Sequence, residues 1–137
     1  MHIRNADPAD LAGLAEVDPI LVSDPQRLVE VAHAIVDHHA FVAEDPAQLL
    51  GYAILNHRFF GNGFVELLVV HPARRRAGVG SALMRHARAL CQTPKLFTST
   101  NASNTPMQAL LDRLGFKHCG VIDALDEGDP EWFYVSL

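Results

Sequence analysis

The sequence predicts an α/β fold in which one mixed β-sheet carries helices on both faces. Short apolar or β-branched runs alternate along the chain with stretches whose apolar residues recur at helical spacing. The run 64–70 is almost continuously apolar, as in a strand buried on both faces, and a helix pattern follows it after a glycine-containing turn. With 137 residues and no visible linker or repeat, we expect a single domain over 1–137.

Two Asp-Pro pairs mark the first helices, after a short first strand at 1–5. Asp7 and Asp24 each stand before a proline, where an N-cap carboxylate and a first-turn proline are both favourable. The first helix has a stripe of Leu11, Leu14 and Ala15. The second is predicted to bury a face with apolar residues at i, i+3, i+4, i+7 and i+8, namely Leu28, Val31, Ala32, Ile35 and Val36.

The rest of the chain alternates strands with two further helices. Strands are predicted at 41–44, 50–57 and 64–70, with turns at 45–47 and 61–63. A helix over 79–90, a strand over 96–100 and a helix over 106–114, which ends at Gly115, come next. Strands at 121–122 and 132–135, joined by a turn at 126–130, complete the order β-α-α-β-β-β-α-β-α-β-β.

Composition excludes several classes of protein. Apolar residues make up 49% and charged residues 20%, which indicates a folded chain. The net charge of −5 argues against nucleic acid as a partner, and no run approaches the ~18 apolar residues of a membrane span. Cys91 and Cys119 lack metal-ligand spacing, so we expect two reduced thiols in or near the core, no metal site and a cytoplasmic location.

The turn before the predicted helix at 79–90 has the features of an anion-binding site. Gly78 and Gly80 lack a Cβ, so the backbone can take positive φ and approach a ligand closely. The first amides of the helix, at Val79, Gly80 and Ser81, have no partner within the helix and sit at the positive end of its dipole. Together with Arg74, Arg75 and Arg76, they indicate a place for a phosphate-bearing ligand.

Other interpretations of this turn are weaker. Taken alone, it could be a surface turn with a solvated basic cluster. A Walker loop requires a lysine after the glycines, and none is present. A dinucleotide fingerprint requires glycine or alanine where Leu83 stands.

Two motifs resemble those of the GCN5-related N-acetyltransferase (GNAT) superfamily. The first is Arg-x-x-Gly-x-Gly, from Arg75 to Gly80, after a strand that ends Val-x-Pro; the second runs from Asn104 to the pair Gly115-Phe116. The order of elements matches from end to end, so the resemblance covers essentially the whole chain. It implies a mostly antiparallel sheet of about seven strands flanked by about four helices. It also implies that the sheet splays between the fourth and fifth strands, where the cofactor lies.

The resemblance implies an acetyl-CoA-dependent N-acetyltransferase that moves the acetyl group to a primary amine in a ternary complex. The pyrophosphate fits the loop of Arg75, Arg76, Ala77, Gly78, Val79, Gly80 and Ser81. The pantetheine amides can pair with backbone at Leu68, Val69 and Val70, as an added strand would. By resemblance Asn104 contacts the cofactor, although it is equally well an N-cap.

Glu66 is the candidate general base for an amine that is mostly ammonium at neutral pH. It is the only charge in its apolar strand and shares the face of Leu68 and Val70 by alternation. Alternatively, Glu66 pairs with an arginine or points to solvent. An oxyanion donor is expected at the backbone N–H of Val69 or Val70.

Leu111 departs from the family pattern, which often has a tyrosine there to protonate the leaving thiolate. Tyr134 and Ser103 are possible substitutes, although Tyr134 fits a core position better. Leu111 is also the main support for an alternative function, a non-catalytic coenzyme A-binding module. A phosphate-loop hydrolase is a weaker third hypothesis, because the required lysine and metal-binding carboxylates are not assembled.

The acceptor is expected to be a small-molecule or peptide amine that the sequence does not identify. The acidic segment Asp123, Asp126, Glu127, Asp129 and Glu131 either attracts a cationic acceptor or, more simply, forms a solvated turn. The segment 57–60, with its pair Phe59-Phe60, is a candidate wall of the acceptor site or a homodimer interface.

Overall fold

The computed structural model describes all residues 1–137 and contains seven strands and five α-helices. The strands form one open sheet in the order β1-β2-β3-β4-β5-β7-β6. The strands are β1 (His2–Asn5), β2 (Ala40–Glu44), β3 (Leu49–Phe59), β4 (Asn62–Val70), β5 (Leu96–Asn101), β6 (Lys117–Ile122) and β7 (Glu131–Ser136). The helices are α1 (Leu11–Val17), α2 (Ile20–Ser23), α3 (Pro25–Val36), α4 (Val79–Leu90) and α5 (Thr105–Arg113). This mixed sheet confirms the predicted fold class, with α2 and two short 3-10 turns as additions.

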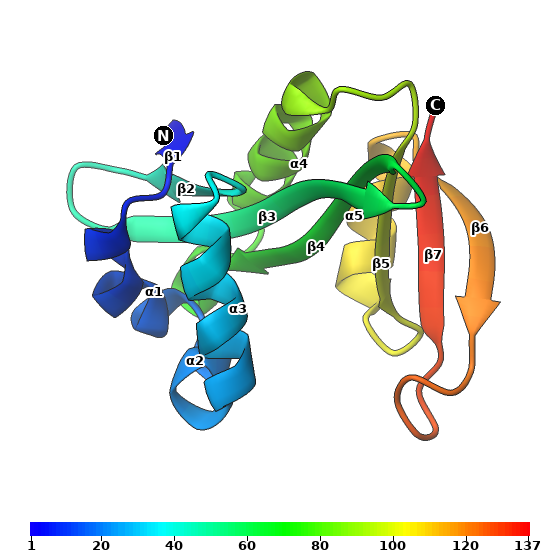
Figure 1. Ribbon diagram of the computed structural model, residues 1–137, viewed down its shortest axis with the longest axis horizontal. Coiled ribbons are helices and arrows are strands. Elements are labelled where there is room, and N and C mark those ends of the chain that lie inside the picture. The colour runs from blue at the N-terminus through cyan, green and yellow to red at the C-terminus, as the bar shows by residue number, and fades with distance from the viewer. The chain divides into compact units, whose positions relative to one another are not determined.

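The chain divides into two compact units. The first unit comprises Met1–Leu55 and Leu67–Leu90, and the second comprises Asn56–Glu66 and Cys91–Leu137. In the first unit β2 pairs antiparallel with β1 and with β3, and helices α1, α2 and α3 gather beside these strands (Figure 1). Its core contains buried residues from these helices and strands, among them Leu14, Val31, Ile35, Val42 and Tyr52.

The predicted helix starts follow the local capping rules. Asp24 Oδ1 accepts hydrogen bonds from the amides of Gln26 and Arg27, at 3.0 and 3.3 Å, and caps α3. Asp7 caps a 3-10 turn (Pro8–Asp10) that leads into α1, in a reciprocal arrangement with the Asp10 side chain. Both Asp-Pro predictions are confirmed.

The predicted buried face of α3 is partly wrong. Val31, Ala34 and Ile35 are its buried residues, whereas Leu28 is 37% and Val36 is 68% exposed. Apolar residues occur on more than one side of this helix, so helical periodicity alone does not select the side that faces the sheet. The side of α3 that carries Ala34 is the one that packs into the core of the first unit.

Strands β3 and β4 form a hairpin whose turn lies at Phe60 and Gly61, one residue earlier than the 61–63 turn predicted. Both turn residues have positive φ, 52° and 77°. Positive φ at both central residues is typical of the turn that suits a two-residue hairpin. The bulky Phe60 at such a position concealed the turn from sequence reasoning, and its side chain is 90% exposed.

The second unit is built on β5, which pairs parallel with β4 and antiparallel with β7. β7 pairs in turn with β6, and Figure 1 shows β5, β7 and β6 side by side. Phe59 lies at the centre of an aromatic cluster, with ring centroids 4.8 Å from Phe64, 5.0 Å from Phe97 and 5.8 Å from Phe133. This cluster supplies much of the apolar packing of a unit that has only one helix.

Two expectations about burial need correction. β4 is not buried on both faces: Val65 is buried and Glu66 is exposed, while Leu67 and Val69 are only partly buried where they pack against the core of the first unit. Cys119 is exposed rather than near the core, because it lies on β6 at the edge of the sheet; Cys91 is half-buried, and both are free thiols. None of the helices combines the length and the apolar composition that crossing a bilayer requires.

Candidate functional site

The loop between β4 and α4 has the geometry expected of an anion-binding turn. A 3-10 turn (Pro72–Arg74) begins at His71, whose Nδ1 accepts a hydrogen bond from the amide of Ala73 at 3.1 Å. Arg76 and Gly78 then take positive φ, 67° and 83°. A Cβ placed on Gly78 would meet nothing within 4 Å, so the space in front of this backbone is open. Left-handed backbone at a non-glycine residue such as Arg76 is uncommon, and such strain clusters at ligand sites.

The first amides of α4 lack partners within the helix. The first helical hydrogen bond near this end runs from the amide of Ala82 to the carbonyl of Gly78, at 3.1 Å. The amides of Val79, Gly80 and Ser81 precede it and stand at the positive end of the helix dipole. Gly80 lies inside the first turn of α4 and does not have positive φ, so the structure corrects its expected role: only Gly78 makes the bend.

The three arginines of the loop differ in what they contact. Arg74 lies 3.6 Å from the Asp45 carboxylate, and the Gln48 amide oxygen can accept from the same guanidinium at 3.1 Å. Arg74 therefore ties the loop to the turn between β2 and β3. Arg75 and Arg76 are exposed, and neither forms an ion pair. They are the cations available to an anion at the helix end.

Strand β3 holds the end of β4 and the start of α4 together. Gly51 is buried, and a Cβ on it would lie 2.8 Å from the Val69 carbonyl oxygen and 3.0 Å from the Val79 side chain. The His71 amide donates to the Leu50 carbonyl at 2.7 Å, at the end of the same strand. The predicted residues Leu68–Val70 and Arg75–Ser81 are thus brought together within the first unit.

Glu66 belongs to the second unit and has one close partner there, which the sequence did not indicate. Its Oε1 accepts a hydrogen bond from Asn56 Nδ2 at 2.6 Å, across the β3–β4 hairpin. Glu66 is exposed, whereas Asn56 is only 3% exposed. Glu66 therefore neither pairs with an arginine nor stands alone in solvent. The sequence does show Asn56 as a polar residue at the end of an apolar run, which could have marked it as a candidate. Its pairing with Glu66 depends on strand register and was not predictable from that pattern.

Asn104 is the N-cap of α5. Its Oδ1 accepts a hydrogen bond from the amide of Met107 at 3.2 Å, and the residue is exposed. The capping bond uses only the amide oxygen, so both N–H donors of the side chain remain free to contact a ligand. The N-cap interpretation is thereby confirmed, and the cofactor contact stays a prediction.

The candidate general acids are poorly placed for that role. Leu111 is fully buried, at the position where the family often has tyrosine. Tyr134 is 2% exposed, and burial, with the nearby negative charge of Asp112, raises the pKa of its hydroxyl above the ordinary value. The Ser103 hydroxyl donates to the Asp129 carboxylate at 2.6 Å. Neither Tyr134 nor Ser103 is positioned as a ready proton donor.

The acidic segment and the segment 57–60 both serve the architecture of the second unit. Asp126 accepts from the Asn101 amide at 2.8 Å, and Asp129 binds both the amide and the hydroxyl of Ser103. These bonds fasten the β6–β7 loop to the end of β5. His57 Nε2 accepts from the Gln92 amide at 3.0 Å, and Phe59 is the centre of the aromatic cluster.

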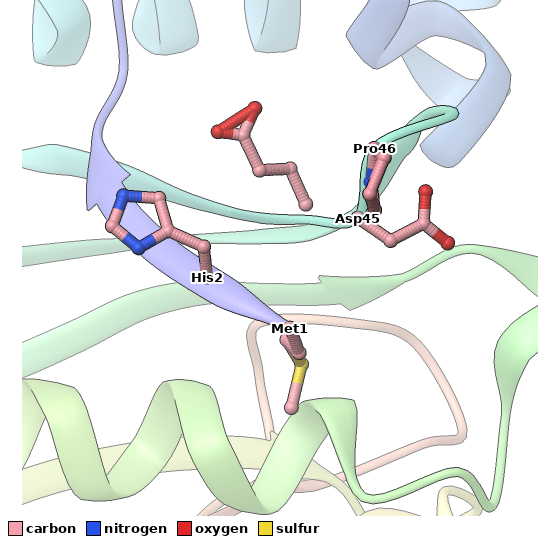
Figure 2. A pocket seen from close by; sticks show the side chains of 5 residues that line it. Met1, His2, Asp45 and Pro46 are labelled. Atoms are coloured by element: carbon pink, nitrogen blue, oxygen red, sulfur yellow. The ribbon is translucent and has the colours of Figure 1, made fainter.

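A shallow pocket of about 510 Å³ lies elsewhere on the first unit, lined by Met1, His2, Glu44, Asp45 and Pro46. Figure 2 shows His2 on β1, Met1 at the end of the chain just before it, and Asp45 and Pro46 at the turn after β2. Its two carboxylates are already engaged: Glu44 with Arg4 at 2.7 Å, and Asp45 with the amides of Ala47 and Gln48 at 2.8 and 2.9 Å. No predicted site residue lines this pocket.

Comparisons with known proteins identify the family of the chain. The sequence matches the model of the acetyltransferase (GNAT) family over residues 11–116. A GNAT-family acetyltransferase from Bacillus cereus has 29% identity and a TM-score of 0.91, with 98% of this chain and 95% of that chain covered. No curated protein matches.

Two more distant structures share the fold. A ribosomal-protein-alanine N-acetyltransferase from Brucella melitensis has 22% identity and a TM-score of 0.76, with 100% of this chain and 99% of that chain covered. The protein yncA from Salmonella typhimurium, solved with its cofactor acetyl-CoA, has 21% identity and a TM-score of 0.75, with 98% and 92% covered. With the family model spanning most of its length, the chain belongs to the acetyltransferase (GNAT) family and is an acetyl-CoA-dependent N-acetyltransferase.

Proposed function

We propose that this protein transfers the acetyl group of acetyl-CoA directly to a primary amine, in a ternary complex with Glu66 as the general base. The observation that carries the proposal is the exposed Glu66 carboxylate, held by a neutral amide rather than by a cation. A general base needs a carboxylate oxygen within reach of the proton that it takes, and an exposed side chain without an ion-pair partner leaves one open to the acceptor. It takes a proton from the ammonium acceptor, directly or through water, and leaves the neutral amine to attack the thioester carbonyl.

The pyrophosphate of acetyl-CoA is proposed to bind the loop of Arg75, Arg76, Ala77, Gly78, Val79, Gly80 and Ser81. The open space at Gly78 and the unpartnered amides at the start of α4 fit a dianionic group, and two exposed guanidinium groups stand beside them. The exposed amide N–H groups of Asn104 are a further proposed contact to the cofactor. No other part of the chain combines these features.

The backbone of Leu68, Val69 and Val70 is proposed to pair with the pantetheine amides, as an added strand would. An N–H of Val69 or Val70 then serves as the oxyanion donor. Removing one such donor typically costs on the order of 3 kcal/mol of transition-state stabilisation. The fixed contact of the Val69 carbonyl with β3 supports a rigid strand at this point.

The thiolate is proposed to leave without a dedicated acid. Leu111 cannot donate a proton, Tyr134 is buried and Ser103 is committed to Asp129. A thiol with a pKa near ~8.5 is a tolerable leaving anion at neutral pH, so transfer proceeds without a general acid. This argument and the family match favour an enzyme over the non-catalytic coenzyme A-binding module.

The proposed activity is tested by the release of free coenzyme A thiol. Acetyl-CoA is incubated with spermidine, lysine, glucosamine or a peptide with a free N-terminus, and we expect release that requires one of these amines. Glu66→Gln should lower kcat by roughly 100-fold and leave the KM for acetyl-CoA within about twofold. Glu30→Gln is the matched control, because Glu30 is an exposed carboxylate on α3 that also accepts from a side-chain amide, that of Gln26 at 3.4 Å. Unchanged turnover of Glu66→Gln over the whole pH range would exclude Glu66 as the base.

We also propose the class of the acceptor and the cellular compartment of the protein. The acceptor is a small-molecule or peptide amine, since the family acts on amines. The two free thiols, Cys91 and Cys119, support a reducing compartment such as the cytoplasm. A homodimer stays a prediction.

A further inference from the structure

The hydrogen bond between Asn56 and Glu66 joins a buried side chain to an exposed one. Asn56 lies on β3 and is 3% exposed; Glu66 lies on β4 and is exposed. Asn56 Nδ2 lies 2.6 Å from Glu66 Oε1, well within hydrogen-bond distance. The buried Asn56 amide donates one hydrogen bond to the exposed Glu66 carboxylate. This bond restricts the positions that the carboxylate can take.

The amide of Asn56 has only one orientation that satisfies its partners. Its Oδ1 accepts a hydrogen bond from the Arg58 amide at 3.0 Å, so its Nδ2 must face Glu66. Rotation of the amide would place two acceptors against each other and leave the Arg58 amide facing a donor. The donor to Glu66 is therefore fixed by the fold before any substrate binds.

The strand that carries Glu66 is also fixed at this point. The Thr98 hydroxyl donates to the carbonyl of Val65 at 2.9 Å, and Thr98 is buried. Val65 and Thr98 are opposite each other in the parallel pairing of β4 with β5. The backbone directly before Glu66 is thus held by β5, and its carboxylate is held by β3.

This arrangement leaves one carboxylate oxygen for chemistry. Oε1 of Glu66 is occupied by the Asn56 amide, while no hydrogen bond engages Oε2. A glutamate on an exposed strand otherwise samples many rotamers, and ordering it during the reaction would raise the barrier. An amide donor restricts the carboxylate and leaves its charge in place, whereas an arginine would neutralise that charge.

We propose that Asn56 is a positioning residue for acetyl transfer: it holds Glu66 so that Oε2 faces the amine or its bridging water. This inference rests on the proposed role of Glu66 as the base. Asn56 itself does not touch the substrate. Its substitution should therefore affect kcat only while Glu66 is present.

A double-mutant cycle on kcat tests the proposal. Asn56→Leu keeps the branched shape of the side chain and has no donor. We expect kcat for the best amine of the panel to fall about 10-fold, with the KM for acetyl-CoA within about twofold. In a Glu66→Gln background the same substitution should change kcat by less than about twofold. Asn62→Ala is the matched control, because Asn62 donates to backbone carbonyls of Phe59 and Phe60 in the same hairpin and does not contact Glu66.

The outcomes distinguish a failure of the positioning role of Asn56 from a failure of the proposed role of Glu66 as the base. An equal loss of kcat from Asn56→Leu in both backgrounds, or no loss in either, overturns the positioning role and leaves the acetyltransferase proposal intact. A protein that releases no thiol, or a Glu66→Gln variant with full turnover, overturns the role of Glu66 and this inference with it. If Asn56→Leu does not fold, the same cycle is measured with Asn56→Ala, which removes the donor to Glu66 and adds neither volume nor charge.

Discussion

The substitution Gly51→Ala tests how tightly the acetyl-CoA loop is fixed to the sheet. The new methyl group would lie 2.8 Å from the Val69 carbonyl oxygen, 3.0 Å from Val79 Cγ1 and 3.1 Å from Leu83 Cδ1. The first of these atoms belongs to the backbone of β4 and cannot turn away, while the other two belong to buried side chains of α4. Relief therefore requires β3, β4 or α4 to move.

Overpacking of this kind typically costs 1–3 kcal/mol, and the backbone contact puts Gly51→Ala at about 2 kcal/mol. For a domain of this size the melting temperature should fall by about 6–10 °C. We also expect the affinity for coenzyme A to fall about 10-fold in calorimetry, because Val79 is the first residue of α4 and its displacement moves the amides proposed to bind the pyrophosphate.

Gly120→Ala is the matched control for this test. A Cβ on Gly120 meets nothing within 4 Å, and the residue lies on the edge strand β6. Its free energy of unfolding should stay within about 0.5 kcal/mol of the wild type. If Gly51→Ala melts at the wild-type temperature and binds coenzyme A normally, the close packing of β3 against β4 and α4 is not what fixes the loop.

Three further substitutions probe the loop and the core of the first unit. Gly80→Glu should weaken coenzyme A binding at least about 10-fold in calorimetry, since it brings a carboxylate to the pyrophosphate site, and should leave the melting temperature nearly unchanged because acidic residues suit a first helical turn. Tyr52→Phe removes a 2.6 Å hydrogen bond to the buried Asp18 and should lower the free energy of unfolding in urea by about 2 kcal/mol. Arg4 hydrogen-bonds Asp10 and Glu44 and thereby lowers the pKa of each carboxyl below its ordinary value of 3.8 or 4.5. Lowered pKa values add stability above the ordinary values and lose it as the pH falls, so Arg4→Met should be less stable than the wild type at pH 7, and urea unfolding at pH 3 should show a smaller difference.

The loop was predictable because its geometry follows from local rules. A glycine can take positive φ wherever the chain needs a bend, and every helix begins with amides that lack internal partners. Gly78 and the amides from Val79 to Ser81 needed no knowledge of the rest of the fold. The left-handed conformation of Arg76 was not predictable, because a non-glycine residue adopts it only when its surroundings impose it.

Features that depend on register or on tertiary packing were missed. The partner of Glu66 depends on a hairpin turn at Phe60 and Gly61, and a shift of one residue in that turn would turn Asn56 to the other face of its strand. The buried side of α3 depends on which apolar residues meet the sheet, and the structure selects the side with Ala34. Neither choice is encoded in a short window of sequence.

The burial of Leu111 connects the packing of α5 to the chemistry of the leaving group. Leu111 is fully buried, so a tyrosine at this position would have to fit extra volume into a packed interior, at a typical cost of 1–3 kcal/mol. The chain gains packing where many relatives place a proton donor. Under the proposed mechanism, the transfer depends more heavily on the attack by the amine, because the base takes the amine proton before the carbon–sulfur bond breaks. In the mechanism that we propose, a fixed Glu66 matters most, because placement of the base is then the one proton transfer that the side chains control.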